Sequence, residues 1–181
     1  MKIQRLAVLI LSTGCLLAVD SPDSPAPTTD RVGFPKDYRE KFQVLRVVNK
    51  KDQKQVVTVY GNDSAASISK SEQLPYPYGS VIVMETSEAS RDKDDSLIQD
   101  EKGNLKPAKA IGLHVMRREK GFGEAYGVNR SGEWEYVEYK PDGSYITPPQ
   151  KSASCSSCHV KAGAAKDFVY QARLGSLTGS K

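Results

Sequence analysis

The chain has 181 residues, with 26 Lys or Arg against 22 Asp or Glu and a formal net charge of +4. The basic residues are scattered rather than gathered in one stripe, which predicts a solvated surface and no nucleic-acid partner. The length is sufficient for one globular domain with a single core.

Residues 1–19 have the pattern of a secretory signal, with two basic residues before an apolar run (6–19) that is too short to span a bilayer. We therefore expect an exported, periplasmic protein. Residues 12–15 also resemble a lipobox, in which Cys15 would become a lipidated first residue, although 16–19 continue the apolar run. Processing with or without a lipid anchor stays open.

Residues 20–30 are rich in Pro, Ser and Thr and predict an extended tether, followed by one domain over residues 31–181. Proline near its first position favours a short helix at 35–39. Cap residues at 62–64 favour a helix over 65–70, and helical signals surround residues 155–159 and the tail. Alternating or β-branched runs predict strands at 43–48, 56–60, 81–85, 110–117 and 133–139. Turns are expected at 75–79 and 141–143.

These elements predict an α+β domain, mainly an antiparallel sheet with flanking helices and a C-terminal helix. The polar segment 87–106 predicts a mobile excursion from the sheet. Its acidic residues raise calcium binding as an alternative, but they lack the regular alternation and the closing glutamate of an EF-hand loop.

The C-terminal part contains Cys155-Ser156-Ser157-Cys158-His159. In this pattern each cysteine sulfur attaches to one haem vinyl group, and the adjacent histidine binds the iron from the proximal side. We therefore predict one covalent haem c, anchored by Cys155 and Cys158, with His159 as iron ligand. Such attachment occurs outside the cytoplasmic membrane in bacteria, so the motif and the export signal support each other.

Two other interpretations of the cysteine pair are weaker. A structural zinc ion needs four protein ligands, and only Cys15, in the leader, and His114 remain to complete the set. A thioredoxin-like dithiol or disulfide would come early in a βαβ unit, whereas this pair follows the predicted strands.

The sixth iron ligand cannot come from the tail, because the 22 residues after His159 contain neither His nor Met. The upstream candidates are Met84, His114 and Met116, and alternation places the last two on one face of their strand. Each also has a structural interpretation, either a methionine filling the core or a histidine hydrogen-bonded within it. A sixth protein ligand favours electron transfer, whereas an open position binds small molecules.

Several segments together resemble the cytochrome P-460 family, which includes the beta-type cytochromes c-prime. They are residues 34–39, 58–60 and 77–83, the strand with Trp134, and the haem motif followed by 167–169. The resemblance implies a mostly antiparallel sheet with flanking helices, usually a homodimer, and one pentacoordinate haem c near the C-terminus. Members oxidise hydroxylamine or bind nitric oxide and carbon monoxide.

The resemblance also assigns distal residues. The lysine that cross-links to haem in hydroxylamine-oxidising members is matched by Met84, so we do not expect that cross-link. The distal carboxylate that accepts protons is matched by His114, within one or two residues. We therefore expect redox chemistry on, or binding of, a small nitrogen species, with His114 as distal acid or base. The alternative is a six-coordinate electron carrier or redox sensor with His114 or a methionine on the iron, and either function needs a redox partner protein.

Overall fold

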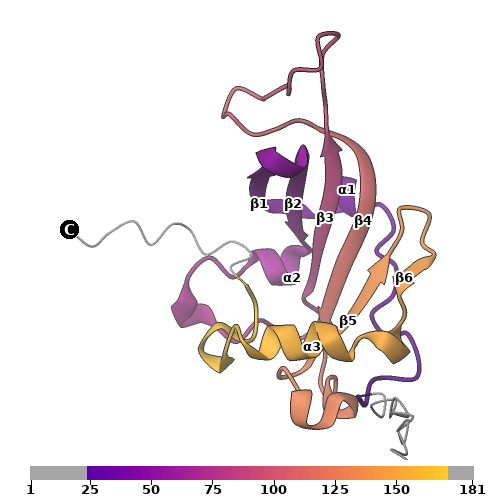
Figure 1. Ribbon diagram of the computed structural model, residues 1–181. Helices are drawn as coiled ribbons and strands as arrows, with labels where there is room; N and C mark the ends of the chain where they lie inside the picture. The colour runs from indigo at the N-terminus through magenta and orange to yellow at the C-terminus, as the bar shows by residue number, and fades with distance from the viewer. Residues whose placement is uncertain (1–23, 171–181) are drawn as a thin grey trace, which may run out of the picture.

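The computed structural model describes residues 24–170. The predicted signal with Cys15, and the tail from residue 171, lie outside the described residues. Six antiparallel strands form one sheet, in which each strand pairs with its neighbour in sequence (Figure 1). The strands are β1 (Gln43–Lys50), β2 (Gln55–Gly61), β3 (Val81–Ala89), β4 (Pro107–Arg118), β5 (Trp134–Tyr139) and β6 (Tyr145–Thr147). The predicted α+β class is confirmed.

The helices are short. The α-helices are α1 (Tyr38–Lys41), α2 (Asp63–Ala66) and α3 (Ala153–Val160). Single 3-10 turns or short 3-10 segments are η1 (Lys51–Gln53), η2 (Ser71–Gln73), η3 (Glu124–Asn129), η4 (Pro149–Lys151) and η5 (Ala164–Lys166). The C-terminal helix expected to carry the haem motif is α3, which crosses the strands of the sheet (Figure 1). Within residues 24–170, no helix is both long and apolar enough to cross a membrane.

The bounds of two predicted helices were wrong. The first helix begins at Tyr38, because Asp37 has a left-handed backbone (φ 58°) and separates Pro35 from the helix. The helix expected over 65–70 is α2, which Asn62 caps as predicted but which ends at Ala66. Beyond it, the Gln73 side chain accepts the backbone N–H groups of residues 69 and 70 and turns the chain.

Strand β6 was not predicted, because three residues carry too little alternation. It forms because the predicted turn at 141–143 returns the chain onto β5, where Tyr145 pairs with Tyr139. Gly143 has φ 85°, a conformation that glycine adopts without the steric cost of a side chain.

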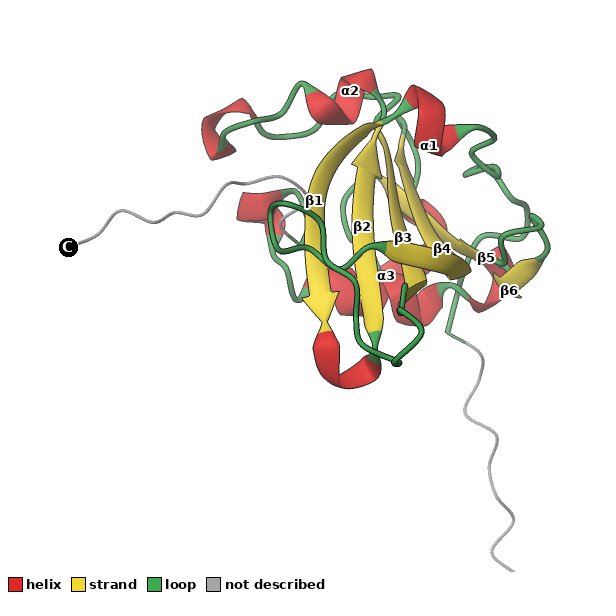
Figure 2. Cartoon of the chain, turned by 90° about the horizontal axis from the view of Figure 1, so that it is seen from above, coloured by secondary structure: helices red, strands yellow, loops and turns green. Residues whose placement is uncertain are grey.

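Alternation divides the sheet into two faces, and each has its own core (Figure 2 shows the strands side by side). The first face packs toward α3 and is called the cavity face. Its buried cluster contains Val57, Val59, Ala65, Ile68, Tyr76, Ile82, Met116, Tyr126, Trp134, Tyr136 and Val169. The opposite face is covered by the segment around α1, with a cluster of Val32, Tyr38, Tyr60, Val83, Leu113, Val115, Val137 and Tyr139.

The segment 87–106 is more regular than expected. Strand β3 continues to Ala89 and β4 begins at Pro107, and the residues between them form two turns at the end of the sheet away from α3 (Figure 1). Asp92 and Asp100 each accept two backbone N–H groups of their own turn. Between residues 24 and 170, no group of three or more His, Cys, Asp or Glu side chains forms a metal site.

The end of the predicted tether contacts the domain. Asp30 accepts hydrogen bonds from the hydroxyls of Tyr139 (2.5 Å) and Tyr145 (3.1 Å), and Pro27 is buried. Arg31 forms an ion pair with the buried Glu135 on β5. These contacts stabilise the chain against β5 and β6 on the approach to α1.

Glu85 is a buried carboxylate on the face opposite the cavity, with 1% exposure. It accepts hydrogen bonds from Tyr38 Oη, Arg39 Nε (2.7 Å) and Ser87 Oγ (2.6 Å). Burial by itself would raise the pKa of Glu85, but the hydrogen bonds and the Arg39 charge outweigh burial and hold this pKa below its ordinary value. The charged form is therefore favoured in the folded protein.

Replacing Glu85 by Gln is expected to reduce the free energy of unfolding at pH 7 by about 2 kcal/mol, because hydrogen bonds to a charged acceptor are lost. Since the folded pKa is lowered, this stabilisation is present above the unfolded pKa and is lost as pH falls through the folded pKa. The difference in free energy of unfolding between the wild type and Glu85→Gln, measured by urea unfolding, should be smaller at pH 3 than at pH 7. Glu88→Gln, at an exposed position of the same strand, is the control. An equal difference between the wild type and Glu85→Gln at both pH values would contradict the role of Glu85.

Candidate functional site

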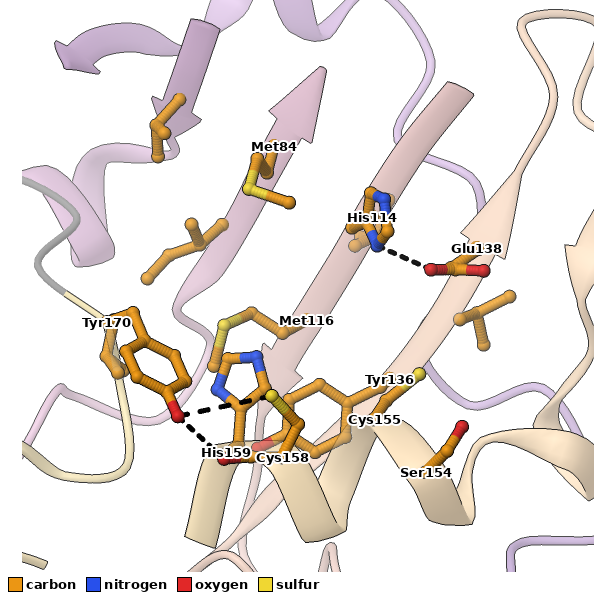
Figure 3. A pocket seen from close by; sticks show the side chains of 15 residues that line it. Met84, His114, Met116, Tyr136, Glu138, Ser154, Cys155, Cys158, His159 and Tyr170 are labelled. Atoms are coloured by element: carbon orange, nitrogen blue, oxygen red, sulfur yellow. Dashed lines mark hydrogen bonds and ion pairs between the residues drawn. The ribbon is translucent and has the colours of Figure 1, made fainter. Parts of the chain in front are cut away.

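A largely apolar cavity of about 420 Å³ lies between α3 and the cavity face of the sheet (Figure 3). This volume falls within the range of roughly 300–1,000 Å³ that is typical of cofactor sites. The cavity is lined by Val59, Ile82, Met84, His114, Val115, Met116, Tyr136, Val137, Glu138, Ser154, Cys155, Cys158, His159, Val169 and Tyr170. All five predicted site residues, Met84, His114, Cys155, Cys158 and His159, are therefore brought to one cavity.

A buried chain of hydroxyls fixes α3 against the sheet. Ser156, between the two cysteines, donates to the Asn129 carbonyl (2.7 Å) and has no exposed surface. Since its one proton is used there, it accepts from Ser131 Oγ (2.8 Å), which in turn accepts from Tyr136 Oη (2.7 Å). Burial raises the pKa of Tyr136 far above its ordinary value, so this phenol remains a donor. The helix that carries the motif is thus held in a defined orientation.

The two cysteines are free thiols on α3 and differ in environment. Cys155 is partly buried against the first core cluster, and burial raises the pKa of its thiol to about 11. Cys158, one helical turn later, is exposed. Tyr170 lies beside it and donates its hydroxyl to the Cys158 carbonyl at 2.9 Å. Both sulfurs line the cavity, as thioether bonds to a group within it require.

His159 presents one ring nitrogen to the protein and keeps the other free for a ligand. Its Nδ1 lies 2.7 Å from the Phe168 carbonyl oxygen, which accepts only from a protonated nitrogen. Nε2 is then the unprotonated nitrogen, the form that binds a metal. The ring packs against Tyr136 (centroids 4.6 Å apart) and Tyr170 (5.4 Å). Burial lowers the pKa of His159, which favours the neutral imidazole.

The sheet supplies the opposite wall of the cavity. Met84 on β3 pairs with His114 on β4, and His114 pairs with Glu138 on β5, so the three side chains form one row across three strands. His114 Nδ1 lies 2.5 Å from Glu138 Oε1. The other carboxylate oxygen accepts a hydrogen bond from the Thr147 hydroxyl on β6. In Figure 3 the His114 ring points sideways toward Glu138 rather than across the cavity toward His159.

The exposure of the three distal candidates distinguishes core residues from accessible ones. The His114 side chain is 50% exposed, so it is not a histidine enclosed in the core. Met84 is also exposed (37%) at the cavity edge. Met116 is 7% exposed and belongs to the first core cluster, as a gap-filling methionine would. The row of Met84, His114 and Glu138 therefore contains the polar groups of this wall, His114 and Glu138, and its exposed residues, Met84 and His114.

Glu138 was missed by the sequence analysis. Strand β5 carries one glutamate on each face, because Glu135 and Glu138 are three residues apart, and alternation does not say which face meets the cavity. The available signal was that Glu138 shares a face with Trp134 and Tyr136, which predicts a carboxylate among aromatic core residues. Its pairing with His114 required the strand register, which the sequence leaves undetermined.

The arrangement fits the predicted haem. One wall offers two thiols and a neutral imidazole nitrogen on a single short helix, which are the attachment and proximal groups of a haem c. The facing wall offers apolar surface together with a histidine and carboxylate pair at its edge. A mainly apolar lining with a few polar groups suits an amphipathic macrocycle.

A family model described as cytochrome P460 matches residues 35–171, which is well over half of the chain. The matched range includes all six strands and the whole of α3. A comparison with curated proteins gave no match.

Proposed function

Because the chain belongs to the cytochrome P460 family and is thus a haem cytochrome, we propose that it carries a single haem c on α3. Cys155 and Cys158 form the thioether bonds, and His159 Nε2 is the proximal iron ligand. The observation that carries this proposal is the hydrogen bond between His159 Nδ1 and the Phe168 carbonyl, because it selects the tautomer with a free Nε2. Bound haem supplies an iron that binds small molecules and exchanges single electrons.

The activity we propose is redox chemistry on, or binding of, a small nitrogen species such as hydroxylamine or nitric oxide. Support comes from the facing wall, where His114 turns toward Glu138 and leaves the space opposite His159 to apolar side chains (Figure 3). A largely apolar cavity admits a small, weakly polar molecule. The resemblance to nitric-oxide-binding and hydroxylamine-oxidising proteins points the same way.

Glu138 is the proton acceptor in this proposal. Thr147 and His114 each hold one oxygen of its carboxylate, so the side chain is fixed at the cavity edge with 19% exposure. A substrate that loses protons on oxidation would deliver them to this carboxylate or to the adjacent imidazole. The resemblance matched the family's distal carboxylate to His114; here the carboxylate comes from the neighbouring strand, and the histidine is its partner.

Met84 stands where hydroxylamine-oxidising members have the cross-linking lysine. A thioether side chain lacks the amine that forms that bond, so we propose a haem attached through the two cysteines alone. The absorption spectrum should then be that of an ordinary haem c, and any hydroxylamine chemistry would proceed without the lysine bond.

We also propose that the protein acts outside the cytoplasmic membrane, either free in the periplasm or anchored by a lipid on Cys15. The export pattern of residues 1–19 and the extracytoplasmic attachment of haem c support this location. A redox partner protein would supply or remove electrons. A homodimer is the assembly that the resemblance favours.

A six-coordinate electron carrier is the second candidate, and one observation favours it. In the neutral tautomer that donates Nδ1–H to Glu138, the His114 Nε2 is unprotonated, which is the form that binds iron. Rotation of the half-exposed His114 side chain toward the iron would close the distal position. Spin state distinguishes the two candidates, because two strong axial ligands give low-spin iron.

Absorption spectra of the ferric and ferrous protein, with and without nitric oxide, test the proposal. We expect high-spin ferric haem that binds nitric oxide. His114→Ala should leave the spin state unchanged and alter nitric oxide affinity by about tenfold at most, the worth of one hydrogen bond. Met84→Leu is the control for a methionine ligand. A low-spin wild type that becomes high-spin in His114→Ala would establish the electron carrier instead.

A further inference from the structure

The turn that provides the acceptor for His159 has an uncommon backbone. Asp167 and Phe168 both have positive φ values, 48° and 60°, although neither is glycine. Such conformations cost of order 1–3 kcal/mol each, and they persist only where surrounding contacts hold them. The conformation of this turn is therefore destabilising by itself, and its effect is to fix the direction of one group, the Phe168 carbonyl.

The contacts that hold this turn converge on Asp167, which is 6% exposed. Its Oδ2 forms an ion pair with Arg118 Nε (3.3 Å) and accepts the Tyr76 N–H (2.9 Å). Arg118, at the end of β4, also donates to the Tyr76 carbonyl (2.6 Å). Arginine, aspartate and the Tyr76 peptide thus form a closed arrangement that ties the turn to the sheet.

Two further contacts fix the flanks of the turn. The Trp134 indole N–H donates to the Asp167 carbonyl at 2.9 Å. The Phe168 ring lies against Gly132, where a Cβ would come within 2.9 Å of it. The next carbonyl along the chain, that of Phe168, then has one orientation, toward His159 Nδ1.

We propose that Arg118 and Asp167 are positioning residues for the proximal ligand, acting through the Phe168 carbonyl on the His159 imidazole. The proposal rests on His159 being the iron ligand, as argued above. A well-directed carbonyl acceptor at Nδ1–H makes the imidazole more electron-rich and strengthens its donation to iron. Electron-rich ligands favour the ferric state, so the pair would keep the reduction potential lower than an unsupported histidine would.

Asp167→Asn tests this on the haem-loaded protein. The amide oxygen can still accept the Tyr76 N–H, but the charge that pairs with Arg118 is lost. We expect the iron–histidine stretching band of the ferrous protein, seen by resonance Raman, to shift to lower frequency, and the reduction potential to rise. Covalent haem content should stay the same. Arg118→Met should shift both quantities in the same directions.

Glu133→Gln is the matched control, because Glu133 also contacts Arg118 (3.3 Å) but does not touch the turn. It should leave the band and the potential unchanged. Near-ultraviolet circular dichroism of Trp134, the single tryptophan, reports whether the variants keep the fold around the turn. A folded Asp167→Asn protein with an unchanged band and potential would overturn the inference, whereas a five-coordinate ferrous wild type without any iron–histidine band would overturn the proposed ligand itself.

Discussion

When both Cys155 and Cys158 are replaced by Ala, no haem is expected to remain on the polypeptide after extraction with acidified acetone. In the wild type the two thioether bonds should keep the pigment on the denatured polypeptide. Without them only the His159 bond and the apolar cavity remain, and both are lost when the chain unfolds. The measurement is the haem absorbance of the protein pellet, together with the mass of the intact chain.

Single variants and a neighbouring position sharpen this test. Cys155→Ala or Cys158→Ala alone should each retain one bond, so pigment stays with the pellet while the reduced absorption bands shift. Ser157→Ala changes a partly exposed residue within the motif and should behave as the wild type does. Full retention of haem in the double variant would contradict covalent attachment at these residues, and a colourless wild type would remove the haem assignment of the motif altogether.

Replacing Glu138 by Gln is expected to slow the reduction of ferric haem by hydroxylamine by a factor of ~10²–10⁴, the usual worth of a positioned proton acceptor. Glutamine keeps the shape of the side chain and an oxygen for His114 or Thr147, but it cannot take a proton. Stopped-flow absorbance at several hydroxylamine concentrations separates binding from the electron-transfer step. A slower rate without weaker binding is the expected pattern.

Nitric oxide provides an internal control for Glu138, because it brings no proton to transfer. Its affinity should change by less than about tenfold in Glu138→Gln. Thr147→Val removes the hydroxyl that orients the carboxylate and should give a smaller loss of rate than Glu138→Gln. If hydroxylamine reduces the wild type and Glu138→Gln equally fast, Glu138 is not the proton acceptor, and His114 becomes the residue to replace next.

The site divides into a part that short sequence patterns specify and a part that they do not. Cys155, Cys158 and His159 lie on one helix, as predicted, because they fall within five consecutive residues, and about one turn of helix brings them together whatever the rest of the fold does. Strand positions were also predicted closely, because runs of β-branched and aromatic residues mark strands such as β2 and β5, which are buried on both faces.

Short sequence patterns did not predict the contact between His114 and Glu138. His114 and Glu138 meet because β4 and β5 pair in one register, and that register depends on the loop between them. A shift by one residue would turn the Glu138 side chain to the other face. The short β6 matters for the same reason, because it brings the Thr147 hydroxyl to Glu138 only after the turn at 141–143 has formed.

By itself, the sequence determined the fold class and the helix that bears Cys155, Cys158 and His159, because each of these follows from local periodicity or from groups adjacent in the chain. The tertiary structure alone decided that a carboxylate stands beside His114 and that Arg118 pairs with Asp167, in the turn whose Phe168 carbonyl contacts His159. These are contacts between residues far apart in the chain. Their geometry is set by strand register and by the packing of the C-terminal segment on the sheet, and neither is encoded in any short stretch of residues.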